Sequence, residues 1–248
     1  MRNVLVTGAA GGLGAAIVKK FIMEGDFVYV TDLQLNDAEK IAHQYEGKAE
    51  ALSLNVADST SVQKIINYIT MKGSLDVLIN NAGIQHRDTI EDFPEDKWDL
   101  LQDVMLKGPF LMTKYVLPHM KKKQYGRIIN ISSVHGETAT PEKVAYVAAK
   151  HGVIGLTKVT ALEGATHNIT ANAVLPGPVK TPLLVQQLND LYEKQGLNEQ
   201  QALAKIMYPR QAMERFIEAS EIADSVYFLS SNNASAITGE TISVSGGI

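Results

Sequence analysis

Three closely spaced side chains could move a proton to or from a substrate: Tyr146, Lys150 and, thirteen positions before the tyrosine, Ser133. Positions i and i+4 share one face of a helix, so the phenol and the ammonium would point into the same space. A nearby cation favours the phenolate and lowers a pKa that is otherwise ~10, which makes tyrosine an acid or base near neutrality. Because Tyr-x-x-x-Lys also occurs by chance on exposed helices, this interpretation depends on the surrounding elements.

The serine belongs to a segment that predicts a buried parallel strand. The apolar run 127–132 ends directly before Ser133. Open α/β sheets bind their ligands at the carboxyl ends of such strands, so the hydroxyl is expected at a ligand site.

The start of the chain predicts a site for the pyrophosphate of a dinucleotide. The strand 3–7 is followed by a turn with Gly8, Gly12 and Gly14, and then by a helix over 12–24. Glycines let the backbone approach phosphates closely, and a helix N-terminus offers unpaired N–H groups. The spacing is Gly-x-x-x-Gly-x-Gly, which differs from the G-x-G-x-x-G pattern of many dinucleotide sites.

A carboxylate at the end of the second strand predicts the choice of cofactor. Asp32 follows the strand 27–31, about twenty residues after the glycine turn, as expected for an acceptor of both adenosine-ribose hydroxyls. The same charge repels a 2′-phosphate, and neither the turn nor the segment after Asp32 carries an Arg or Lys to attract one. The sequence therefore favours NAD over NADP.

Strand-like and helix-like segments alternate along the whole chain, which is typical of an α/β protein with a doubly wound parallel sheet of the Rossmann type. We predict one domain, 1–248, in which 182–218 forms a small helical lid over the substrate. The seven predicted strands are 3–7, 27–31, 49–54, 75–79, 127–132, 169–174 and 241–245. The predicted helices are 12–24, 37–46, 59–72, 95–122, 142–166 and 220–230.

Composition excludes several classes of function. A net charge of −4 leaves no basic surface for nucleic acid. The absence of cysteine excludes disulfides and thiolate chemistry, and the scattered histidines predict no metal site. No apolar run approaches the roughly 18 residues of a membrane-spanning helix, and no signal peptide precedes the first strand. We therefore expect a cytoplasmic protein without a membrane anchor.

Together, these motifs resemble the short-chain dehydrogenase/reductase family over essentially the whole chain. The similar runs are Thr7 to Gly14, Asn80-Asn-Ala-Gly83, Ser133, Tyr146-x-x-x-Lys150 and Pro176-Gly177. The resemblance implies a homotetramer and a catalytic set of Ser133, Tyr146 and Lys150. It also implies that NAD is bound by Gly8, Gly12, Leu13, Gly14, Asp32, Asn55, Val56, Asn81, Gly83, Tyr146, Lys150, Pro176, Gly177, Val179 and Thr181.

Further runs resemble the bacterial D-3-hydroxybutyrate dehydrogenases, among them 82–86, 133–136, 143–152 and 181–187. That resemblance implies a small carboxylate substrate, held by Gln85, His135, Lys143 and Gln187. A small anion needs several donors and a cation to offset its desolvation. The predicted reaction is the reversible, NAD-dependent oxidation of D-3-hydroxybutyrate to acetoacetate. Alternatives within the family are a 3-oxoacyl-thioester reductase and a sugar-alcohol dehydrogenase.

One position departs from the family pattern. Met105 stands where the resembling family usually has an asparagine, its fourth catalytic residue, thought to hold a water in a proton route. A thioether binds water far more weakly than an amide. This departure keeps a second class of function open, a catalytically weak NAD-binding sensor. We expect an active enzyme, because Ser133, Tyr146 and Lys150 are all retained.

Overall fold

The computed structural model describes residues 1–180, 196, 198, 201 and 211–248. Its seven strands form one sheet in which every neighbouring pair is parallel. The strands are β1 Asn3–Thr7, β2 Phe27–Asp32, β3 Ala49–Ser53, β4 Val77–Asn80, β5 Gly126–Ile131, β6 Ile169–Pro176 and β7 Thr241–Val244. All seven predicted strands are confirmed, with ends that differ by at most two residues.

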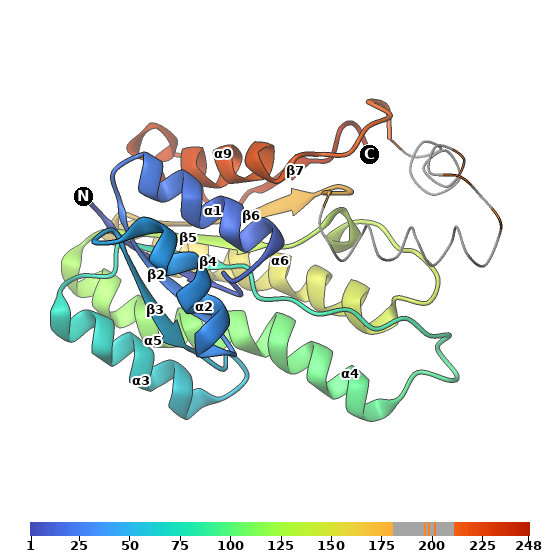
Figure 1. Ribbon diagram of the computed structural model, residues 1–248, viewed down its shortest axis with the longest axis horizontal. Helices are drawn as coiled ribbons and strands as arrows, with labels where there is room; N and C mark the ends of the chain where they lie inside the picture. Colours follow the sequence, from blue (N-terminus) through green and yellow to red (C-terminus); the bar gives the residue numbers. More distant parts are fainter. Residues whose placement is uncertain (181–195, 197, 199–200, 202–210) are drawn as a thin grey trace.

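The order of the strands across the sheet is β3-β2-β1-β4-β5-β6-β7. Strands are therefore added in one direction from β1 to β3 and in the opposite direction from β4 to β7, and the point of reversal lies between β1 and β4. The predicted doubly wound sheet is therefore confirmed. In such sheets ligands bind outside the carboxyl ends of the strands, at the point of reversal. The β6 arrow in Figure 1 points toward this end of the sheet.

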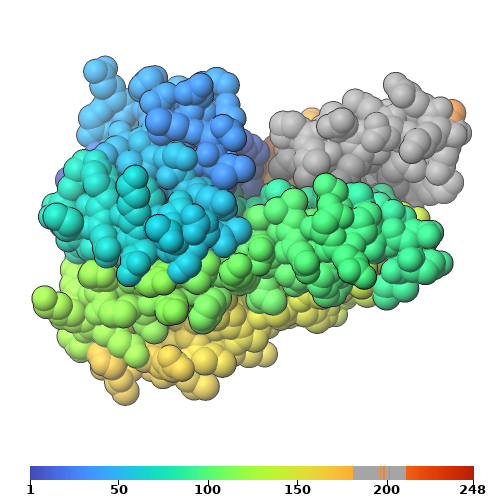
Figure 2. Space-filling view, turned by 90° about the horizontal axis from the view of Figure 1, so that it is seen from below, coloured from blue at the N-terminus to red at the C-terminus, as the bar shows by residue number. Residues whose placement is uncertain are grey.

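Helices cover both faces of the sheet (Figure 1), because strand side chains point alternately to either face. Val4 and Val6 pack against one helical layer, whereas Leu5 between them packs against the other. The first layer consists of α1 Gly12–Met23, α2 Leu35–Ala42 and α9 Ala219–Ser230. The second contains α3 Ser59–Lys72, α5 Gly108–Lys123 and α6 Val144–Gly164. Seen from below, much of the surface belongs to this second layer and to the segment before α5 (Figure 2).

The predicted helix over 95–122 is helical throughout, but it contains a π-helical turn that the prediction did not include. The structure has α4 Glu95–Gln102, then a π-helical turn at Asp103–Lys107, and only then α5. Pro109 explains the interruption, because it has no N–H to donate to the Met105 carbonyl four residues earlier. The Gly108 N–H instead reaches the Asp103 carbonyl, five residues back. Such π turns are frequent at functional sites.

Other element ends differ from the prediction by short 3₁₀ turns. The predicted helix 37–46 is α2 followed by the turn His43–Tyr45, and α6 ends in the turn Ala165–His167. The predicted lid, 182–218, lies mostly outside the described residues. Its last part, 211–218, is anchored to the sheet, because Gln211 Nε2 donates to the Ser245 carbonyl at 2.9 Å.

Candidate active site

The turn after β1 forms a backbone cradle that fits a pyrophosphate. Gly8 and Gly12 have φ angles of +60° and +53°, which residues with a Cβ rarely adopt. A Cβ at Gly14 would lie 2.3 Å from the Gly8 carbonyl oxygen, so only glycine fits there. No side chain caps the N-terminus of α1. Its free N–H groups and the positive end of the helix dipole therefore remain available to an anion.

A cavity of about 510 Å³ opens beside this turn. Asp32 lies on its wall, with Oδ2 accepting from the Ala10 N–H at 3.0 Å and Oδ1 accepting from the Leu33 N–H at 2.8 Å. These bonds hold the carboxylate in the position expected for a ribose acceptor. The predicted cofactor residues on the wall are Gly8, Gly12, Leu13, Gly14, Asp32, Asn55, Val56, Asn81 and Gly83.

Two asparagines on this wall have defined partners. Asn81 Nδ2 donates to the carbonyls of Thr7 at 3.0 Å and Gly8 at 2.9 Å, which ties the end of β4 to the glycine turn. Asn55 Oδ1 accepts from the Ala57 N–H at 3.0 Å. An amide oxygen has a second lone pair, so Asn55 still has an acceptor and two donors for a ligand.

A smaller cavity of about 220 Å³ holds the three predicted catalytic side chains, Ser133, Tyr146 and Lys150. Ser133 follows β5 and the other two lie on α6, so the carboxyl end of the sheet and one helix build the site together. The two cavities share wall residues, namely Leu13, Asn81, Gly83 and Ile84. The predicted proton-transfer groups therefore adjoin the cavity that the predicted cofactor residues line.

Burial governs the protonation of the two titratable groups. It raises the pKa of Tyr146, and a hydrogen bond from Ser133 acts in the opposite direction. Burial also lowers the pKa of Lys150 to about 8. Lys150 Nζ donates to the Ile131 carbonyl at 2.7 Å and lies 5.6 Å from the centre of the Tyr146 ring. In the protein alone, loss of solvent therefore outweighs the expected lowering of the tyrosine pKa by the lysine.

A buried polar network below the site joins neighbouring strands through Asn80, whose partners the sequence did not identify. Asn80 Nδ2 donates to Asn130 Oδ1 at 2.7 Å, and Asn130 Nδ2 donates to Thr157 Oγ1 at 2.8 Å. Ser132 Oγ donates a further hydrogen bond of 2.9 Å to the Lys150 carbonyl. Helix α6 is therefore held against the end of β5 at two positions along its length, Lys150 and Thr157. Asn130, an amide inside an apolar strand, was the available signal. The network assigns Asn80 a structural role.

Three of the four predicted substrate residues fall within the described residues. Gln85 lies on the wall of the smaller cavity, and its buried Nε2 has no hydrogen-bond partner there. Lys143 precedes α6, and burial together with the nearby Arg87 lowers its pKa. His135 Nδ1 lies 3.4 Å from Ser133 Oγ. Gln187 lies outside the described residues.

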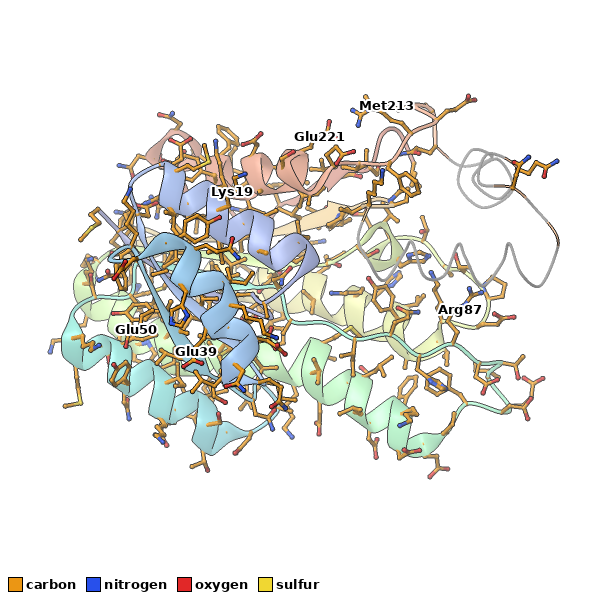
Figure 3. All side chains as sticks on the ribbon, in the orientation of Figure 1. Lys19, Glu39, Glu50, Arg87, Met213 and Glu221 are labelled. Carbon is orange, nitrogen blue, oxygen red and sulfur yellow. The ribbon has the colours of Figure 1, made fainter. Side chains whose placement is uncertain are left out.

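The loop after β4 runs beside the residues that precede α6, which brings Lys143 next to this loop. Asp88 forms a bridge with Lys143, and its N–H donates to the Glu142 carbonyl at 3.1 Å. Arg87 pairs with the Glu142 carboxylate at 2.7 Å. Figure 3 shows Arg87 beyond the carboxyl ends of the strands, with Glu50 at the opposite end of the molecule.

The remaining predicted cofactor residues follow β6. Pro176 lies on the wall of the smaller cavity. Gly177 packs against the backbone of Ser245, where a Cβ would approach Cα to 2.7 Å, and Val179 belongs to the core of the first helical layer. Gly177 and Val179 are not among the described residues that line the two cavities. Thr181 lies outside the described residues.

Met105 lies in the π-helical turn and is only 1% exposed. It packs in an apolar cluster with Leu101, Ala145 and Ala149, against which the Tyr146 ring also packs. Its sulfur lies 3.7 Å from the point where a Cβ on Gly83 would be. The side of the tyrosine that faces α4 is therefore lined by hydrocarbon and a thioether.

Two further searches covered the described part of the chain. No group of three or more His, Asp or Glu side chains there could hold a metal ion. Within the same residues, no helix has both the length and the hydropathy needed to cross a membrane.

Comparison with known proteins agrees with this geometry. Residues 2–191 match the short chain dehydrogenase family. An uncharacterized oxidoreductase of Bacillus subtilis is 46% identical over 98% of this chain and 96% of its own length. A D-beta-hydroxybutyrate dehydrogenase of Cupriavidus necator is 38% identical, with coverages of 99% and 97%. A 3-oxoacyl-[acyl-carrier-protein] reductase of Thermotoga maritima is 37% identical, with coverages of 98% and 96%. The chain belongs to the short-chain dehydrogenase family, whose members are oxidoreductases that use a nicotinamide cofactor.

Proposed function

We propose that this oxidoreductase interconverts D-3-hydroxybutyrate and acetoacetate with NAD. One observation supports the choice of a small anionic substrate: Gln85 lines the catalytic cavity, and its buried amide donor has no partner among the described residues. A buried donor left unpaired costs about 1–3 kcal/mol, which a bound acceptor would recover. The similarity to the Cupriavidus necator dehydrogenase supports the same substrate.

Lys143 supports an anionic substrate independently. Burial lowers the pKa of its ammonium, and it forms no ion pair with any residue that the structure describes. Burying a cation without a counter-ion in the protein costs free energy, and a substrate carboxylate would supply that counter-ion. We propose that Gln85, Lys143, His135 and Gln187 surround the carboxylate.

The catalytic residues would divide the chemistry among them. Tyr146 would accept the proton of the substrate hydroxyl, and Ser133 would hydrogen-bond the oxygen that becomes the carbonyl. Lys150, protonated below its pKa of about 8, would stabilise the phenolate and bind the nicotinamide ribose. Bound NAD would supply the acceptor for the hydride that leaves the carbinol carbon.

A 3-oxoacyl-thioester reductase is the second candidate, because the Thermotoga maritima reductase is almost as similar to this chain as the dehydrogenase is. Asp32 favours the dehydrogenase, since it would repel the 2′-phosphate of NADP. Parallel assays with D-3-hydroxybutyrate plus NAD and with a 3-oxoacyl thioester plus NADPH separate the two. A higher kcat/KM in the thioester assay would refute our proposal.

Lys143 offers a test of substrate charge. Lys143→Gln should raise KM for D-3-hydroxybutyrate by at least about tenfold and leave KM for its methyl ester nearly unchanged, because the lysine interacts with the carboxylate. Shortening Gln187 is expected to act in the same direction. Lys158→Gln, at an exposed lysine on α6, is the matched control. Equal handling of acid and ester by the native protein would contradict the assignment.

Met105 offers a test of the enzyme against the sensor hypothesis. Met105→Asn should leave kcat unchanged or raise it within about tenfold, because the base, the lysine and the serine are already in place. Met105→Leu controls for changes in packing, since it keeps the site apolar at a similar volume. Steady-state kinetics with NAD and D-3-hydroxybutyrate measure both variants. A gain of several orders of magnitude over a nearly inactive native protein would instead support the sensor.

A further inference from the structure

A series of neighbouring polar side chains leads from Tyr146 away from the cofactor cavity. Ser133 and Tyr146 line the same small cavity, and Ser133 Oγ lies 3.4 Å from His135 Nδ1. On the other side of the imidazole, Nε2 lies 2.9 Å from Thr140 Oγ1. Thr140 is half-buried and stands between the exposed residues Ala139 and Pro141. The series of side chains thus leads from Ser133 to a half-buried hydroxyl whose two neighbours in the sequence are exposed.

Local structure fixes the position of the His135 imidazole in this series of polar side chains. The His135 N–H donates to Ser133 Oγ at 3.2 Å at the start of the 3₁₀ turn Val134–Gly136, which fixes the backbone on which the ring sits. The ring packs edge-on against Tyr146, with centroids 6.0 Å apart and an interplanar angle of 79°. Each nitrogen of the His135 ring therefore lies next to a hydroxyl of the series, Nδ1 next to Ser133 and Nε2 next to Thr140.

The opposite side of the tyrosine offers no comparable path. There the ring packs against the apolar cluster around Met105. Lys150 is 5% exposed, and its Nζ donates to the Ile131 carbonyl, which has no proton to pass on. Among the described side chains, the polar continuation from the phenol runs through Ser133.

Oxidation of an alcohol leaves one proton on Tyr146 in each turnover, and that proton must reach the solvent before the next. An imidazole suits this task because one nitrogen accepts while the other donates. We propose that His135 is the relay residue that carries this proton, an inference that rests on the proposed dehydrogenase chemistry. The proton passes from Tyr146 through Ser133 Oγ to Nδ1, while Nε2 releases its own proton through Thr140 Oγ1 to the buffer. The two electrons leave separately, with the hydride.

The test follows NADH and the released proton together in a single turnover, using an indicator dye in weak buffer. In the native protein both signals should rise together, whereas His135→Ala should delay the proton behind NADH by at least about tenfold. Imidazole in the buffer should restore kcat, whereas KM should stay raised, because His135 is also one of the proposed carboxylate ligands. His151→Ala is the matched control, because His151 is an exposed histidine on α6. Thr140→Val should cause a smaller delay.

Two results would overturn the relay. One is simultaneous release of NADH and the proton from His135→Ala. The other is a raised KM with unchanged kcat and no effect of imidazole, which would make His135 a carboxylate ligand only.

A second measurement needs no turnover, so it separates the relay from the choice of substrate. In nitrogen NMR spectra of histidine-labelled protein, Ser133→Ala should shift the Nδ1 signal of His135 and leave that of His151 unchanged. An unmoved His135 signal contradicts the relay whichever alcohol the enzyme oxidises. A shifted signal in a protein that does not oxidise D-3-hydroxybutyrate supports the hydrogen-bonded chain and contradicts only the proposed function.

Discussion

Replacing Tyr146 with Phe is expected to lower kcat by about 10²–10⁴-fold while the fold and the affinity for the cofactor persist. The change removes only the phenolic oxygen, which lies with Ser133 and Lys150 in the smaller cavity. The ring itself keeps its packing against the apolar cluster around Met105. Turnover of D-3-hydroxybutyrate with NAD measures the loss, and calorimetric titration with NADH measures binding separately.

Tyr115→Phe provides the control, because it removes the same atom from a tyrosine on α5 whose hydroxyl bonds to Ser59 at 2.7 Å. That variant should keep native kcat. If Tyr146→Phe retained more than about a tenth of native kcat, another group would have to transfer the proton.

Asp32→Ala is expected to produce the second large effect, on the choice of cofactor. The native protein should prefer NAD to NADP by well over tenfold in kcat/KM, a difference above about 1.4 kcal/mol. The carboxylate accepts ribose hydroxyl bonds and repels a 2′-phosphate, so its removal should shrink this ratio. Part of the effect should come from loss of the 3.0 Å bond that Asp32 accepts from the Ala10 N–H in the glycine turn.

The matched control is Asp37→Ala, which removes an exposed carboxylate of α2 that pairs with Lys40 at 2.7 Å. It should leave the ratio of NAD to NADP use unchanged. Equal use of both cofactors by the native protein would refute the role assigned to Asp32.

Elements set by local spacing were the easiest to predict. The apolar runs 27–31 and 127–132 are buried on both faces of the sheet, as continuous hydrophobic strands in parallel sheets are. The glycine turn required no knowledge of distant residues, because the positive φ angles of Gly8 and Gly12 are a property of the turn itself. Tyr146 and Lys150 face one cavity because residues four apart share a helix face.

Sequence patterns predicted less where two effects compete. Apolar and helix-forming residues around 103–107 predicted a regular helix, but the structure has a π-helical turn there, directly before Gly108 and Pro109, of which the proline has no N–H to donate. The neighbouring lysine predicted a lowered pKa for Tyr146, but burial has the larger effect on the phenol.

The order of the elements, the glycine cradle and the choice of candidate reacting side chains followed from the sequence alone, because each depends on neighbours a few residues away. The partners of Asn130, the burial of Lys150 and the contact of His135 with Thr140 did not. A hydrogen-bond partner or a loss of solvent is set by atoms that the fold brings together, and a one-dimensional pattern carries no distances between them. For the same reason, the proposed proton relay could be argued only from the folded structure.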